Sequence, residues 1–124
     1  MLEKHYGPDY FTVSIILGDL GNASGALGDH QKQKELLEHA LPILKKYYGS
    51  NHFIVVRTLV NLGTAYRALG NPQKAKELLE QVLAIQEEHY GPDHFEVART
   101  LMSLGNAYGD LGDHKKKKSC SNVL

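Results

Sequence analysis

The sequence predicts an all-α fold, a right-handed α-solenoid of antiparallel helix pairs, and three observations support this prediction. A block beginning at Tyr6 returns after 42 residues at Tyr48 and after 42 more at Tyr90. Leu-Gly pairs recur at the same spacing, as Leu20-Gly21, Leu62-Gly63 and Leu104-Gly105. Apolar residues between these marks recur every three or four positions, which is typical of one helix face. A fixed period of about 20–50 residues is the signature of a solenoid, whose units bury their apolar faces against neighbouring units.

Each unit is expected to contain two helices, and the middle unit shows this most clearly. Between residues 53 and 69, apolar side chains follow one helical stripe, which Gly70-Asn71-Pro72 then ends. Gly70 suits the left-handed position after a helix, Asn71 can cap the next helix, and Pro72 suits its first turn. The second helix is therefore expected from Pro72 to about His89.

Equivalent helices are expected over 10–27, 29–47 and 94–111, which gives five substantial helices. Pro42 lies inside the second of these ranges and should bend that helix near Glu38, because it removes one backbone hydrogen bond. The acidic residues that precede the expected helices are better explained as helix caps than as catalytic acids; they are Asp9, Asp29, Asp93 and Asp113. Asp93 and Glu96 also have the spacing of a capping pair. The glycines inside helices, Gly21, Gly63 and Gly105, indicate a close approach of neighbouring helices.

The repeat divides the chain into a partial unit (1–8), two complete units (9–50 and 51–92) and an incomplete unit (93–113). Residues 114–124 are expected to form a poorly ordered polar tail, because this segment lacks the Leu-Leu pair of the earlier second helices. Leu101, Leu104 and Tyr108 should then be uncovered. The alternative is that 115–124 folds back over them as a poor helix. The chain is interpreted as a fragment of a longer array or a truncated product, with self-association through its uncapped ends or only marginal stability.

The composition excludes several classes of protein. Among 124 residues, 14 basic residues balance 14 acidic ones, whereas partners such as nucleic acid or a membrane surface favour a basic bias. Cys120 is the only cysteine, so no intrachain disulfide can form and a reducing compartment fits best. No signal-peptide core follows Met1, and no apolar run approaches the ~20 residues needed to span a bilayer. A soluble cytoplasmic protein is expected.

No group of residues predicts an enzyme, a cofactor or a metal site. His89 and His94 lie on either side of a turn, and no cysteine or paired carboxylate completes a tetrahedral metal site with them. Histidines recur with the repeat and are interpreted as structural residues beside the linkers. Tyr66 and Tyr108 are interpreted as packing residues between helices. The Lys115–Lys118 run could act as a nuclear-import signal, but such runs are usually solvated.

Particular positions of the unit resemble the tetratricopeptide repeat, in the 42-residue form seen in kinesin light chains. In the middle unit the matching residues are Leu62, Gly63, Tyr66, Ala75 and Leu79, and the segment 91–97 resembles the linker of that subclass. Departures are Ser24 in place of the tyrosine, Gln33 and Lys117 in place of the small residue, and Val82 in place of a second alanine. The resemblance covers about 1–113. It implies that the first helix of each pair lines a concave surface, which binds extended peptides or short helices.

This concave surface is the candidate site. The residues left there after the packing stripe is removed form a predicted peptide-binding groove: Asp19, Asn22, Arg57, Asn61, Thr64, Arg67, Arg99, Ser103 and Asn106. Asparagine can donate to and accept from a peptide backbone, and Arg57 and Arg99 could hold a carboxylate by paired hydrogen bonds. The sequence therefore predicts a non-catalytic protein-interaction module. The alternatives are that these residues are merely exposed, and that the chain is a structural spacer or solenoid fragment with no ligand of its own.

Overall fold

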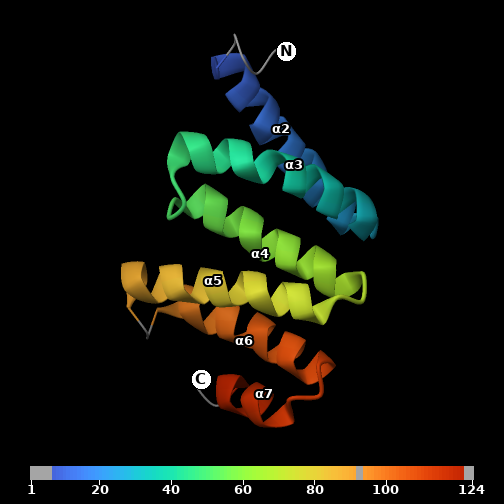
Figure 1. The fold of residues 1–124 in the computed structure, drawn as a ribbon, viewed down its shortest axis with the longest axis vertical. Coiled ribbons are helices and arrows are strands. Elements are labelled where there is room, and N and C mark those ends of the chain that lie inside the picture. The colour runs from blue at the N-terminus through green and yellow to red at the C-terminus, as the bar shows by residue number, and fades with distance from the viewer. Residues whose placement is uncertain (1–6, 92–93, 122–124) are drawn as a thin grey trace.

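The computed structural model describes residues 7–91 and 94–121, in which six helices stack in chain order with no strand between them (Figure 1). The helices are α2 (Gly7–Ala26), α3 (His30–Tyr48), α4 (Phe53–Ala68), α5 (Pro72–Tyr90), α6 (Phe95–Asp110) and α7 (His114–Ser121). Each packs chiefly on the helices before and after it in the chain, so α2 and α7 lie at opposite ends of the stack. The predicted all-α solenoid of antiparallel helix pairs is confirmed.

The turn inside each helix pair is built in the same way three times. A glycine with positive φ follows the first helix: Gly28, Gly70 and Gly112, at +87°, +83° and +83°. The next residue caps the second helix, because a side-chain oxygen of Asp29, Asn71 or Asp113 accepts a hydrogen bond at 3.1 Å from the backbone N–H three residues later. These predicted caps are confirmed. The side chain of Asp9, within α2, is outside the description.

The turns between pairs use histidine as the cap. Nδ1 of His52 accepts from the backbone N–H of Ile54, and Nδ1 of His94 accepts from that of Glu96, both at 3.1 Å. The His52 ring also stacks between Tyr48 and Phe53, with centroid distances of 4.1 and 4.9 Å. The structural role predicted for these histidines is confirmed. Asp93 lies outside the described residues, and the residue that caps α6 is His94 rather than Asp93.

The core runs between successive helices and is made of aliphatic side chains that recur with the repeat. Leu37 and Leu44 of α3 pack with Val55 and Leu59 of α4, and all four are at most 2% exposed. Helix α3 continues through Pro42 from His30 to Tyr48 without interruption. Burial of such side chains against neighbouring units is the main source of stability in a solenoid.

The three glycines within first helices do mark close helix contacts, but to different degrees. A Cβ added at Gly21 would lie 3.0 Å from Leu37, and one added at Gly105 would lie 3.2 Å from the Cys120 Cβ. At Gly63 the nearest atom, in Leu79, would be 3.4 Å away, an ordinary contact distance. The approach is therefore tight in the first and last pairs and looser in the middle pair.

The expectation of a poorly ordered tail is wrong for residues 114–121, which form α7 and pack on α6. Leu104 and Tyr108, expected to be uncovered, are only 3% and 8% exposed, and Cys120 is 8% exposed beside them. The Asp113 cap starts this helix, and the small Gly109 leaves room for the long stem of Lys117. Residues 122–124, and residues 1–6 of the expected partial unit, lie outside the described residues.

Candidate peptide-binding groove

A groove of about 640 Å³ lies between α4 and α6, with the C-terminal half of α5 contributing to its walls. Its apolar lining includes Phe53, Val56, Val60, Ile85 and Met102. Polar residues from all three helices, and Asn51 from the turn before α4, also line it: Asn51, Arg57, Asn61, Gln86, His89, Glu96, Arg99, Thr100, Ser103 and Asn106. An apolar surface with a limited set of directional polar groups is the usual composition of a ligand-binding site.

Five of the nine predicted site residues lie in this groove: Arg57, Asn61, Arg99, Ser103 and Asn106. Arg57 and Arg99 occupy the same position in successive repeats, one on α4 and one on α6. Nη1 of Arg99 lies 3.3 Å from Oε1 of Glu96, one turn earlier, and the Arg99 side chain is 73% exposed. Such an exposed pair is weak, so this guanidinium can exchange Glu96 for another acceptor.

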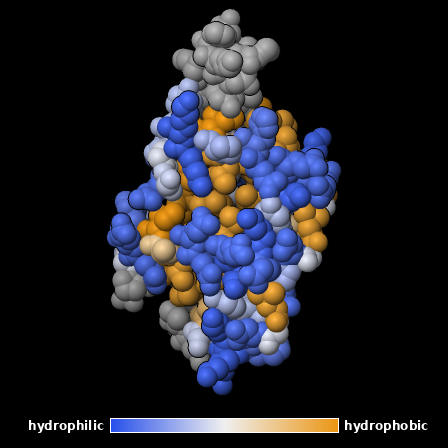
Figure 2. Space-filling model, in the orientation of Figure 1, coloured by the Kyte–Doolittle hydropathy of each residue, from blue (hydrophilic) through white to orange (hydrophobic). Residues whose placement is uncertain are grey.

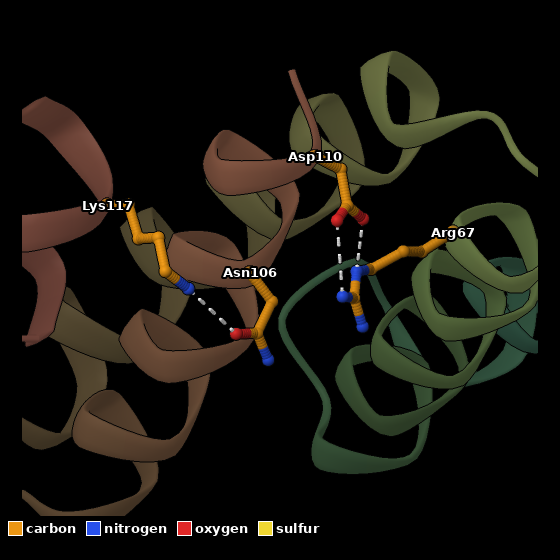
Figure 3. A network of polar contacts seen from close by, with 4 residues as sticks. All are labelled: Arg67, Asn106, Asp110 and Lys117. Carbon is orange, nitrogen blue, oxygen red and sulfur yellow. Dashed lines mark hydrogen bonds and ion pairs between the residues drawn. The ribbon is translucent and has the colours of Figure 1, made fainter. Parts of the chain in front are cut away.

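Thr64 and Arg67 line a second hollow of about 460 Å³, together with Asp110 and other residues of α4 and α6. His30 of α3 and Leu79 of α5 also line it. Figure 3 shows Arg67 of α4 reaching Asp110 of α6, with Nε and Nη2 both facing the carboxylate; the Nη2–Oδ1 distance is 3.3 Å. Asn106 Oδ1 also faces Nζ of Lys117 at 3.4 Å. This part of the predicted site is thus already engaged in contacts within the chain.

Asn22 and Asp19 lie on α2, one turn apart. Asn22 Oδ1 accepts a hydrogen bond at 2.8 Å from Nδ2 of Asn61, which joins the first unit to the second at the groove. Asp19 is exposed and is not among the residues that line either hollow. Thr64 donates to the Val60 carbonyl of its own helix at 3.1 Å. The sequence thus predicted residues of the first helices that line the two hollows, but it did not show how these side chains are paired.

Sequence reasoning missed the contribution of α5. Ile85, Gln86, His89 and Tyr90 line the groove although they belong to a second helix. Ile85 and His89 are four residues apart and therefore lie on one face of α5, a signal that was present in the sequence. The buried oxygen of Gln86 accepts a hydrogen bond from the hydroxyl of Thr100, which fixes part of this wall.

Two tyrosines join neighbouring repeats. The Tyr108 hydroxyl donates to Glu80 Oε2 at 2.7 Å, and Tyr66 makes the equivalent bond to Glu38, 28 residues away in both cases. Burial, followed by the carboxylate that accepts the hydrogen bond, raises the pKa of each phenol to about 12. Their predicted packing role thus includes a hydrogen bond to the preceding second helix.

The groups that line the groove can form hydrogen bonds and ion pairs with a ligand. Within the described residues, no three His, Cys, Asp or Glu side chains lie close enough together to hold a metal ion. Across the same part of the chain, no helix is long and apolar enough to cross a membrane. Guanidinium, amide and hydroxyl groups face the groove instead, and they recognise carboxylates and peptide backbones.

Solved structures of similar proteins place this arrangement in a known fold. BtubC (BKLC) from P. vanneervenii is 24% identical, with a TM-score of 0.78 over 89% of this chain and 44% of its own. A Podosopora anserina putative kinesin light chain with nearly identical TPR-like repeats is 30% identical, with a TM-score of 0.78 over 86% of this chain and 51% of its own. A single-substitution variant of that protein is 32% identical, with a TM-score of 0.76 over 89% and 52% of the two chains. The present chain thus spans about half the length of these structures.

The family assignment rests on the sequence as well as on the fold. No match was found among curated proteins. The sequence model of the tetratricopeptide repeat matches residues 12–88, which is more than half of the 124 residues. Proteins of this kind are generally non-catalytic scaffolds for contacts between proteins. The predicted resemblance to kinesin-light-chain-like repeats is confirmed, and the chain belongs to the tetratricopeptide repeat family.

Proposed function

We propose that this chain is a non-catalytic interaction module that binds a peptide segment of a protein partner in the concave groove between α4 and α6. The single observation that carries this proposal is the groove itself, in which Arg57 and Arg99 face an apolar surface that includes Val60 and Met102. The solitary Cys120, which excludes an intrachain disulfide, supports a cytoplasmic location. Nucleic acid and membrane are not expected as partners of a chain with balanced charge.

The chemistry of the groove favours an extended peptide with both apolar and acidic side chains. Arg57 and Arg99 are offset by one repeat along the groove, so they can engage acceptors at separate points of one peptide. Asn61, Ser103 and Asn106 offer donors and acceptors for the peptide backbone. Apolar side chains of the peptide would cover Val60, Ile85 and Met102, and this burial would supply most of the affinity.

A structural spacer inside a longer solenoid is the second candidate, because some concave polar groups are paired within the chain. Arg67 binds Asp110, and Asn61 binds Asn22, so both contacts hold successive units together. A spacer would use these contacts to fix the spacing of attached domains and would need no ligand. The two candidates differ in what they require of the groove arginines. A peptide would bind them, whereas a spacer would not need them, and no hydrogen bond or ion pair joins the Arg57 side chain to another described residue.

Selection of peptides from a random library on the immobilised chain tests the proposal. Selected peptides are then titrated against the Arg57→Ala/Arg99→Ala variant by fluorescence anisotropy. We expect the double variant to weaken binding by about tenfold or more, because each lost charge-assisted hydrogen bond contributes roughly 1.5–3 kcal/mol at a binding site.

The matched control is Lys74→Ala/Lys76→Ala, which removes two positive charges from α5 residues that are not part of the groove lining. This control should bind the selected peptides as the wild type does. Failure to select any peptide, or equal binding by the wild type and the arginine double variant, would favour the spacer. Circular dichroism of both variants checks that their helix content is unchanged.

A further inference from the structure

The three arginines of this chain all line the surface between α4 and α6. Arg57 and Arg99 line the groove, and Arg67 lines the second hollow. Figure 2 shows hydrophilic surface along the length of the stack, so polar side chains as such are not confined to this region. A planar guanidinium forms paired hydrogen bonds with a carboxylate, which a lysine ammonium does not. The confinement of arginine to this surface therefore favours carboxylates as the groups that it recognises.

The two hollows adjoin each other along α6. Ser103 and Asn106 line both of them, and Asp110 of the second hollow lies one helical turn beyond Asn106. On α4, Arg67 lies about 15 Å beyond Arg57 along the helix axis, at about 1.5 Å per residue. An extended peptide covers this distance with about five residues. A peptide that binds at Arg57 and continues past Asn106 would therefore reach Arg67.

Arg67 differs from the groove arginines because it already binds a carboxylate at two points. Its Nε and Nη2 both face Asp110, as Figure 3 shows. Arg99 meets Glu96 through one nitrogen at 3.3 Å, and no hydrogen bond or ion pair joins the Arg57 side chain to another described residue. Asp110 is the one acidic residue among the described residues that line the second hollow. It thus occupies the position that a ligand carboxylate would take at Arg67.

The repeat indicates that the fold does not require this acidic residue. Ala26 and Ala68 occupy the positions equivalent to Asp110 in the two preceding first helices. The Arg67 and Asp110 side chains are 44% and 37% exposed, and an ion pair with this exposure contributes little to stability. The effect on a ligand is different, because a displaced Asp110 would remain beside Arg67 and repel an incoming carboxylate. Since Asp110 belongs to the same chain, it is also always present to compete for Arg67.

We propose that Asp110 closes the second hollow to ligand carboxylates and thereby confines the acidic residues of a bound peptide to the end of the surface at Arg57 and Arg99. This inference rests on the proposed function and adds the order of residues in the ligand. The part of the peptide that lies over the second hollow carries no acidic side chain, and Ser103 and Asn106 meet its backbone with donors and acceptors. Asp110 therefore determines specificity by repulsion.

Nuclear magnetic resonance of the arginine Nε–H groups tests this role with a defined probe, tetraglutamate with blocked termini. The chain gives three such signals, which substitution of each arginine by lysine assigns. In the wild type we expect tetraglutamate to shift the signals of Arg57 and Arg99 and to leave that of Arg67 unchanged. In Asp110→Asn, which keeps the size of the side chain, the Arg67 signal should also shift. The dissociation constant of tetraglutamate should then fall by about threefold or more.

Glu77→Gln is the matched control, because it removes one negative charge from an exposed residue of α5 that lines neither hollow. This variant should behave as the wild type does in the titration with tetraglutamate. Circular dichroism checks that both variants keep their helix content.

The Arg67 signal decides the inference, and the other two signals decide the proposed function. An Arg67 shift in the wild type or in Glu77→Gln would overturn the role of Asp110. So would an unmoved Arg67 signal in Asp110→Asn, which is the result expected of a purely structural contact between units. Fixed signals of Arg57 and Arg99 beside a shifted Arg67 in Asp110→Asn would support the role of Asp110 and count against the groove as a site for carboxylates.

Discussion

The two ends of the stack carry the same kind of first helix but bury it differently. At the C-terminal end, α6 is packed between α5 and α7, and its Leu104 is 3% exposed. At the N-terminal end, α2 is packed against α3, and the equivalent Leu20 is 51% exposed. The residue type and the register are identical. In this fold the neighbouring helix, rather than the residue, therefore decides whether a position belongs to the core.

Truncation of the two equivalent leucines should give the largest difference between the two ends of the stack. Leu104→Ala should lower the free energy of unfolding by about 2–4 kcal/mol, since it removes a buried side chain and leaves a cavity. Leu20→Ala should cost less than about 1 kcal/mol, because this side chain is half exposed in the single chain. Urea denaturation at low micromolar concentration measures both. Equal losses would show that α2 is covered in solution.

The caps of the terminal helix pairs offer the next largest effect. Asp113→Ala should destabilise α7 by about 1 kcal/mol, because the Lys116 backbone N–H loses its acceptor. Asp29→Ala removes the same bond to Lys32 and should have a similar cost at α3. The helical signal near 222 nm and the urea midpoint report both losses. An unchanged Asp113→Ala protein beside a destabilised Asp29→Ala protein would show that α7 contributes little.

Tyr108 gives the C-terminal end a contact that the N-terminal end lacks, since Ser24 occupies the equivalent position in α2. Tyr108→Phe should cost about 0.5–1 kcal/mol at neutral pH, the usual net value of one hydrogen bond. The folded-state pKa of about 12 lies above the ordinary 10.0, so this phenol contributes stability below pH 10 that is lost as the pH rises towards 12. Urea midpoints at pH 7 and pH 11 should therefore differ less in Tyr108→Phe than in the wild type.

The smallest expected effect concerns the helix contacts at the glycines, which are tight in the end pairs and looser in the middle pair. Gly63→Ala should stabilise the chain by up to about 0.5–1 kcal/mol, because alanine favours the helix and its Cβ meets Leu79 at 3.4 Å. Gly21→Ala should gain less or lose stability, since its Cβ would lie 3.0 Å from Leu37. Thermal unfolding of the two variants compares them. A larger gain at Gly21 would contradict the order of helix distances.

The fold and most helix boundaries could be predicted from the sequence, because the 42-residue period repeats caps, glycines and apolar stripes together. The tail was misjudged because its fit depends on a pair of residues on different helices. Gln33 and Lys117 replace the usual small residue, and each faces a glycine, Gly25 or Gly109, whereas Ala75 occurs in the unit that has Arg67 at the glycine position. This exchange of size across a helix pair is visible only when both helices are compared.

The sequence indicated which side of the first helices carries the candidate site, but not which of its polar side chains are already paired within the chain. The positions of Arg57, Asn61 and Arg99 in the 42-residue repeat predicted that they lie on one side of the first helices, and in the structure they line one groove. Whether such a side chain is free depends on distances between units, as for Arg67, which faces Asp110 from the next unit. The α5 side of the groove was missed because only the first helices were considered.

Hydrogen–deuterium exchange of the whole chain, read helix by helix at low concentration, tests the central claim most directly. The claim is that the covering helix sets burial in each unit. It predicts the slowest exchange in α3, α4, α5 and α6, which are packed on both sides, with faster exchange in α2 and α7 that is still slower than in an unstructured peptide. Exchange of α7 at the rate of an unstructured peptide, or of α6 as fast as α2, would contradict the account.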